Sequence, residues 1–311
     1  MYRIGIDLGG TNIAVGVVNE NYEIVAHHSV PTGASRPAEE VIRDMGDAVE
    51  AVLVKAGVSI DQCESMGIGS PGNCDSERGV VARAYNLGWF DVPICAMLHE
   101  RFGIPVRLSN DANCAALAET VAGAAVGCEN MVLITLGTGV GGGVVVDGKI
   151  VAGANGGAGE VGHMTVEPNE TVHCNCGKKG CLEQYASANG IVRMAKVMLA
   201  QCDTPSKLRE LEKFTSKDIC DLAREGEEMA CTILDRCGEY LGRAMSYVSC
   251  VTDPDVFIVG GGMSRAGTII TNAALKYYRK YAFHVSTGTA IVIAELGNDA
   301  GIFGCVKMIL D

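Results

Sequence analysis

A strand, a glycine–threonine turn and a returning strand occur twice in this chain, and each copy opens one half of it. In the first copy an alternating apolar strand ends at Asp7, and Gly-Gly-Thr at residues 9–11 turns the chain back. In the second copy an apolar strand over residues 132–136 leads into Gly-Thr-Gly at residues 137–139. Alternating apolar residues bounded by glycine turns are typical of β-hairpins. The repeat therefore predicts two related lobes.

Segments with helical spacing lie between and after the two hairpins. Apolar residues recur at helical spacing over 41–52 and 216–250, and an alanine-rich stretch over 110–125 begins with Asn-Asp. A short apolar strand over 256–259 runs into three glycines. We expect an α/β chain with a duplicated βββαβα-type unit, two lobes and a central cleft. The predicted small lobe comprises residues 1–112 and 298–311, and the predicted large lobe comprises residues 113–297.

The composition is that of a globular chain without a broad basic surface. Hydrophobic residues make up 48% and charged residues 20% of the 311 residues, and the formal net charge is -12. This charge disfavours a nucleic-acid partner. The sequence has no apolar run of membrane-spanning length, so we expect a cytoplasmic protein. Most of the 14 cysteines stand singly in apolar stretches, which favours reduced, buried thiols over a disulfide framework.

The two glycine–threonine turns are candidate phosphate sites. Their glycines allow a ligand to approach the backbone N–H groups, and Thr11 and Thr138 add hydroxyl donors. The carboxylate of Asp7 would repel a phosphate, but it can hold a hydrated Mg²⁺ that the phosphates share. The alternative is that both turns are plain hairpins, which the matched copies disfavour. Neither a Walker A pattern nor a dinucleotide-binding fingerprint is present.

Asn110 and Asp111 stand at the predicted start of a helix. An Asn-Asp pair at this position is by itself a common helix cap. The alternative is chemical: Asp111 accepts the proton of an attacking hydroxyl, and Asn110 orients the substrate. Phosphoryl transfer needs a positioned carboxylate, a metal and phosphate donors, so the chemical interpretation agrees with the two turns.

Three cysteines and one histidine form a closely spaced group of metal-ligand type. Cys174, Cys176 and Cys181 can complete a tetrahedral structural zinc site with either His163 or His173. A residue directly beside a ligand usually points elsewhere, so His163 is favoured over His173, which adjoins Cys174. The alternative is a chance group of reduced cysteines.

These segments together resemble a known protein family over nearly the whole chain. Asp7–Thr11 resembles the phosphate-1 motif of the actin-like ATPase superfamily, Leu136–Gly139 its phosphate-2 motif, and Gly260–Met263 its adenosine motif. The stretch from Glu160 through the cysteines to Glu183 resembles the signature of the ROK family. The resemblance implies a two-lobed actin-like ATPase (ribonuclease H-like) fold that closes over ATP.

The resemblance also implies a role for each matching residue. Asp111 would be the catalytic base, ATP would bind with Mg²⁺, and a structural Zn²⁺ would support the sugar site. The residues implied to bind the sugar are Gly72, Asn86, Asn110, Asp111, Glu160, His163 and Glu183. Those implied to bind the nucleotide and its metal are Asp7, Gly9, Gly10, Thr11, Asn12, Gly137, Thr138, Gly139, Gly261, Gly262 and Met263. Those implied to bind zinc are His163, Cys174, Cys176 and Cys181.

The implied activity is phosphorylation of a hexose by ATP, with glucose as the expected substrate. Fructose, N-acetylmannosamine and N-acetylglucosamine stay open as substrates, because motif residues do not show the shape of the sugar pocket. The family also includes sugar-sensing repressors, which carry an N-terminal helix-turn-helix domain. Here the first strand begins at Tyr2, so we expect an enzyme. The expected partners are ATP and a small-molecule sugar, without nucleic acid or membrane, in a homodimer or homotetramer.

Overall fold

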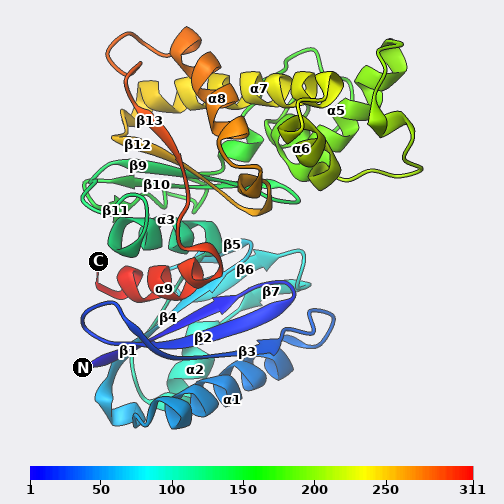
Figure 1. Cartoon of the computed structure of the whole chain (residues 1–311). Helices are drawn as coiled ribbons and strands as arrows, with labels where there is room; N and C mark the ends of the chain where they lie inside the picture. The colour runs from blue at the N-terminus through cyan, green and yellow to red at the C-terminus, as the bar shows by residue number, and fades with distance from the viewer. Residues whose placement is uncertain (311) are drawn as a thin grey trace. The chain divides into compact units, whose positions relative to one another are not determined.

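The computed structural model describes residues 1–310 and divides into two compact units (Figure 1). The first unit comprises Met1–Gly127, Gly148–Ala158 and the segment from Leu296 to the C-terminus. The second unit comprises Cys128–Asp147 and Gly159–Glu295. Among the described residues, no helix is both long and apolar enough to cross a membrane.

The first unit is built on a five-stranded sheet in the order β3-β2-β1-β4-β8. Strands β1, β2 and β3 pair antiparallel, whereas β1, β4 and β8 pair parallel. The parallel strands bring their carboxyl ends to one edge of the sheet, where ligands bind in α/β folds. The strands are β1 (Tyr2–Leu8), β2 (Asn12–Val18), β3 (Ile24–Pro31), β4 (Cys63–Ser70) and β8 (Val106–Asn110). A separate antiparallel sheet contains β5 (Asn73–Asp75), β6 (Val80–Ala84) and β7 (Trp89–Val92).

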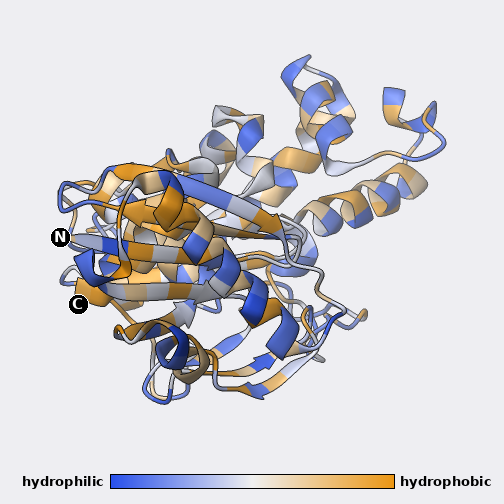
Figure 2. Ribbon diagram, turned by 90° about the horizontal axis from the view of Figure 1, so that it is seen from below, coloured by the Kyte–Doolittle hydropathy of each residue, from blue (hydrophilic) through white to orange (hydrophobic). Residues whose placement is uncertain are grey.

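Amphipathic helices cover this sheet. Val41, Met45, Val49 and Val52 recur along one face of α1, and all four are fully buried. Figure 2 shows the matching pattern, with hydrophobic and hydrophilic residues alternating along the helices. The helices of this unit are α1 (Ala38–Ala56), η1 (Ile60–Gln62), α2 (Ile94–Phe102), α3 (Asp111–Ala122), η5 (Gly297–Asp299) and α9 (Ala300–Leu310), and Lys149–Ile150 forms the short strand β11.

Helices α3 and α9 approach each other closely because α9 presents glycines at the contact. A Cβ atom at Gly304 would overlap the backbone carbonyl of Cys114 in α3. A Cβ atom at Gly301 would overlap the carboxylate of Asp7 in β1. The C-terminal helix therefore packs directly against the first strand of the sheet.

The second unit repeats the strand arrangement of the first. Its strands run in the order β10-β9-β12-β13, with β9 and β10 antiparallel and β9, β12 and β13 parallel. Strands β2, β1, β4 and β8 have the same relative directions, so the structure confirms the duplication inferred from the two hairpins. The strands are β9 (Met131–Leu136), β10 (Val140–Val146), β12 (Val256–Gly260) and β13 (Ala290–Ile293).

The helices of the second unit differ from the expected pattern in one place. The continuous helical periodicity over 216–250 is divided into α6 and α7 at Gly226, whose φ of 81° ends the first helix. The long α7 packs against α8. The helices are η2 (Val161–His163), α4 (Glu183–Ala186), α5 (Ala188–Gln201), η3 (Lys207–Arg209), α6 (Ser216–Arg224), α7 (Glu228–Thr252), η4 (Gly262–Ala266) and α8 (Thr268–Tyr281).

Candidate active site

The turn between β1 and β2 is tight and is held from behind by Thr32. The backbone N–H of Gly9 donates to the carbonyl of Asn12 over 2.9 Å, and the buried Thr32 hydroxyl donates to the carbonyl of Gly9 over 2.7 Å. Gly10 and Thr11 at the tip are exposed. The turn thus offers a rigid backbone and a free-standing threonine to a ligand, as a phosphate-binding turn requires.

Asp7 and Asp111 lie at the carboxyl ends of parallel strands on either side of β4. Asp7 pairs with Gly69 and Asn110 pairs with Ser70, so the strand ends are nearly level, with Asp111 following directly. Burial, and next the negative charge of Asp111, raise the pKa of Asp7 to about 6. A carboxyl group whose ionisation is disfavoured by burial and by a second carboxylate is a typical arrangement for sharing a cation or dividing acid and base roles.

The raised pKa of Asp7 contributes a loss of stability to the ligand-free protein as the pH rises. A carboxyl group with a higher pKa in the folded chain favours folding at low pH, and this contribution is lost as the pH rises through about 6. We expect Asp7→Asn to raise the free energy of unfolding by roughly 2–3 kcal/mol near pH 8 and by less near pH 5. Urea unfolding without nucleotide or Mg²⁺ measures the difference. Equal or lower stability of the variant at both pH values would contradict this prediction.

Asn110 both caps α3 and contacts a second predicted residue. Its Oδ1 accepts the N–H of Ala112 over 2.9 Å, and its Nδ2 donates to the carbonyl of Gly72 over 2.8 Å. Gly72 has a φ of 92° and no space for a side chain beside β6. Asn86 lies beside the β1–β2 turn, because a Cβ atom at Gly10 would come within 3.3 Å of its Nδ2. The first unit therefore brings all its predicted substrate residues to the strand ends near Asp7.

In the second unit the matching turn between β9 and β10 is held by the start of α5. The N–H of Ala188 donates to the carbonyl of Gly137 over 2.8 Å, and Asn189 Nδ2 donates to the carbonyl of Thr138 over 3.2 Å. Glu183 Oε2 accepts the N–H of Val140 over 3.1 Å and lies so close that a Cβ atom at Gly139 would overlap it. The predicted phosphate turn and the predicted sugar ligand Glu183 are therefore direct neighbours.

The loop that carries Cys174, Cys176 and Cys181, called the cysteine loop, brings Cys174 close to both His163 and Glu183. The Sγ of Cys174 is 3.9 Å from Nδ1 of His163 and 3.7 Å from Oε1 of Glu183. His163 ends the short helix η2, and Glu160 stands exposed immediately before that helix. Nδ1 of His163 is therefore the ring atom that faces the thiol.

His163, Cys174, Cys176 and Cys181 form a group whose ligand atoms all lie within 4.8 Å of one another. The Sγ atoms of Cys176 and Cys181 are 3.6 Å apart, close to the ~3.8 Å edge of a tetrahedral zinc–thiolate site. The rival histidine, His173, is not in this group, and its Nδ1 faces the carbonyl of Gly177 at 3.0 Å. These donors fit Zn²⁺ in number, type and spacing.

The glycines at the end of β12 lead into a turn that borders a cavity of about 200 Å³. Gly261 has a φ of 81° and lies against the backbone of Leu136, so only glycine fits there. The cavity lies between this turn and α6, which was not assigned a role from the sequence. The sequence does contain a signal for this role: Lys217 and Arg224 of α6 are seven residues apart, and that spacing places them on one face of the helix. The lining residues are Ser216, Lys217, Cys220, Arg224, Gly262, Met263, Arg265 and Ala266.

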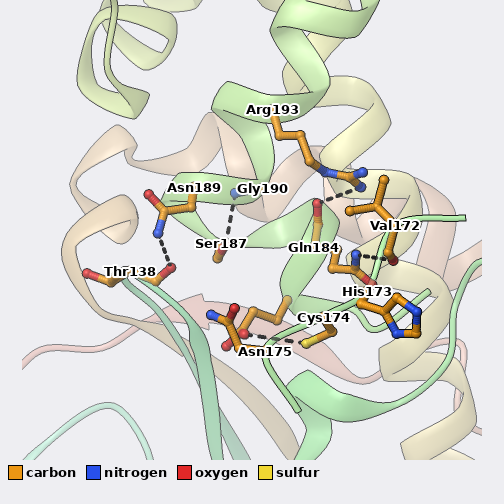
Figure 3. A pocket seen from close by; sticks show the side chains of 11 residues that line it. Thr138, Val172, His173, Cys174, Asn175, Gln184, Ser187, Asn189, Gly190 and Arg193 are labelled. Carbon is orange, nitrogen blue, oxygen red and sulfur yellow. Dashed lines mark hydrogen bonds between the residues drawn. The ribbon is translucent and has the colours of Figure 1, made fainter. Parts of the chain in front are cut away.

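A second cavity, of about 180 Å³, adjoins the β9–β10 turn (Figure 3). Thr138 and Glu183 line it together with Asn175, Asn189 and Arg193, none of which the motifs had identified. Asn189 and Arg193 both come from α5, whose periodicity shows an amphipathic helix but not which polar residues face a ligand. Only the folded position of α5 against the turn shows this.

Comparison with known proteins places this arrangement in a family. The model of the ROK family matches residues 3–311. The chain belongs to the ROK family. A glucokinase of Halalkalibacterium halodurans is 38% identical over 97% of this chain and 93% of its own.

Solved structures of ROK proteins have the same fold. A ROK hexokinase from Thermus thermophilus superposes with a TM-score of 0.83 and 32% identity, covering 100% of this chain and 98% of its own. A ROK glucokinase from Streptomyces griseus, in complex with glucose and AMPPNP, has a TM-score of 0.79 and 34% identity over 98% of both chains. These matches confirm the predicted family and the predicted α/β, actin-like ATPase fold.

Proposed function

We propose that this ROK protein is an ATP-dependent glucokinase that converts glucose and ATP to glucose 6-phosphate and ADP. The observation that carries the proposal is the placement of Asp111 beside Asp7 and Asn110 at the carboxyl ends of parallel strands. A base, a cation-holding carboxylate and a substrate-orienting amide are the groups that phosphoryl transfer to an alcohol needs. The glucokinase and hexokinase relatives support the choice of a sugar as acceptor.

In this proposal each predicted site residue of the first unit has one role. Asp111 accepts the proton of the sugar hydroxyl as it attacks the γ-phosphorus atom. Asn110, held by the carbonyl of Gly72, orients the sugar. Asp7 holds the hydration shell of Mg²⁺, and that ion, when bound with ATP, supplies charge neutralisation at the phosphates. The backbone and hydroxyl of Thr11 donate hydrogen bonds to the phosphates.

The second unit supplies the remaining contacts. The Thr138 turn donates to the phosphates, and the cavity between Gly261–Met263 and α6 receives the adenosine. Glu160, His163 and Glu183 bind sugar hydroxyls. Nδ1 of His163 would be a ligand of a bound zinc ion, and Nε2 would then carry the ring proton and donate it to a sugar hydroxyl.

Other parts of the proposal concern the protein as a whole. We propose that it acts in the cytoplasm as a homodimer or homotetramer. We also propose that residues 1–112 and 298–311 form its small lobe, a smaller set than the first compact unit, which extends to Gly127 and includes Gly148–Ala158. Of these residues, Asp311 lies outside the described part of the chain.

A substrate panel tests the choice of glucose. We expect kcat/KM with Mg-ATP to be highest for glucose and at least about tenfold lower for fructose, N-acetylmannosamine and N-acetylglucosamine, the size of effect that one altered group in a binding pocket produces. ADP release in a coupled assay gives the initial rates. A higher kcat/KM for one of the other sugars would show that this sugar, and not glucose, is the preferred substrate. The absence of ADP release with all four sugars would refute the kinase proposal.

A further inference from the structure

Glu170, in the loop between η2 and α4, has more hydrogen bonds than a surface carboxylate usually has. Its side chain is 10% exposed. Oε2 accepts the hydroxyl of Tyr185 over 2.5 Å and Nη2 of Arg193 over 2.7 Å. Oε1 accepts the backbone N–H groups of Thr171 and Val172, each over 2.9 Å. Burial alone would raise the pKa of Glu170, but the bonds from Arg193, Tyr185 and Val172 lower it to about 2, so the carboxylate stays charged at any working pH.

Gln184, which belongs to α4, also forms hydrogen bonds with the loop between η2 and α4. Its Nε2 donates to the carbonyl of Val172 over 3.0 Å, and its Oε1 accepts the N–H of Cys181 over 3.1 Å. Nη2 of Arg193 also donates to the carbonyl of Gln184 over 3.3 Å (Figure 3). The loop that carries the cysteines is thus joined at both ends to α4, a helix of only four residues that begins with Glu183.

Tyr185 joins α4 to the long helix α7. The ring of Tyr185 stacks on Tyr240 of α7, with 4.1 Å between the ring centres, and the guanidinium of Arg193 lies 5.1 Å from the ring of Tyr185. Helix α7 has 25 residues and is buried along most of one face. A short helix such as α4 holds little orientation of its own, so these side chains fix its position, while the N–H of Val140 holds the carboxylate of Glu183.

We propose that Glu170 is a positioning residue for the sugar: it clamps the cysteine loop to α4 and α5 and thereby sets Glu183 and His163. The inference rests on the proposed function, because it needs Glu183 and His163 to bind the sugar. The clamp contacts the segments that carry the sugar-binding side chains, whereas none of Glu170, Tyr185 and Arg193 lines the adenosine cavity beside α6. Its loss should therefore separate the two substrates kinetically.

The test compares Glu170→Gln and Tyr185→Phe with Asp235→Asn. Asp235 is a matched control, because its carboxylate also accepts a cation and a tyrosine hydroxyl, from Lys276 over 2.7 Å and Tyr277 over 2.6 Å, at a distance in sequence from the cysteine loop. We expect Glu170→Gln to raise KM for glucose by ~10- to 100-fold, as displacement of a positioned group by about 1 Å does, with KM for ATP nearly unchanged. Tyr185→Phe should do the same to a smaller extent, and Asp235→Asn should leave both KM values unchanged.

Two results would overturn the inference. If Glu170→Gln and Tyr185→Phe lower the melting temperature as Asp235→Asn does but keep the wild-type KM for glucose, the network only stabilises the fold. If Glu170→Gln raises both KM values equally, it disturbs the whole unit. Should Glu170→Gln fail to fold, the smaller Tyr185→Phe change decides in the same way.

A Glu183→Gln variant separates failure of the inference from failure of the proposed function. A raised KM for glucose in Glu183→Gln with no change in Glu170→Gln refutes only the clamp. An unchanged KM in Glu183→Gln refutes the sugar site itself, and the clamp with it.

Discussion

Replacing Asp111 with Asn is expected to lower kcat by ~10²- to 10⁴-fold, the usual contribution of a general base. The amide keeps the size of the side chain but accepts no proton, so glucose should still bind. The change also removes the second cause of the raised pKa of Asp7, so the ligand-free variant should be at least as stable as the wild type.

Steady-state rates and glucose binding by calorimetry measure the two effects separately. Glu227→Gln is the control, since Glu227 also begins a helix with its carboxylate, accepting the N–H of Ala230 over 2.6 Å. If the Asp111→Asn variant has the same kcat as the Glu227→Gln variant, Asp111 is only part of a helix cap.

Removal of the proposed zinc should have the second large effect. We expect Cys181→Ser to lose about one zinc atom per chain and to raise KM for glucose by ~10- to 100-fold, the range seen when the support of a metal site is lost. Cys181 is fully buried, so the four-residue α4 and the cysteine loop lose their common anchor. Elemental analysis gives the zinc content, and Cys250→Ser, at an exposed thiol of α7, is the matched control.

The histidine ligand is tested by a pair of variants. His163→Ala should release zinc, whereas His173→Ala should retain it; the reverse result would show that the ligand was wrongly assigned.

Zinc binding should also weaken as the pH falls. Burial and the neighbouring thiols raise the pKa of Cys181 to about 12 without metal, so metal binding must displace protons from the thiols.

Local sequence patterns predicted those features of the fold and the site whose residues are close together in the chain. The turn at residues 9–11 and its copy at 137–139 need glycine for backbone reasons, so the sequence shows them directly. The cysteines at 174, 176 and 181 are close enough in the chain to suggest a metal site. The long helical periodicity over 216–250, by contrast, concealed the break at Gly226, because a single glycine costs a helix little.

The sequence by itself determined the duplicated α/β unit, the two glycine–threonine turns and the group of candidate zinc ligands, because each depends on neighbouring residues. Only the tertiary structure decided which distant groups meet. It brought Asp7 beside Asp111, directed His163 rather than His173 at the cysteines, placed α6 at the cavity beside Gly262 and Met263, and joined Glu170 to α4. These pairings arise from strand order and helix packing, which bring together residues far apart in the chain, and no local periodicity records them.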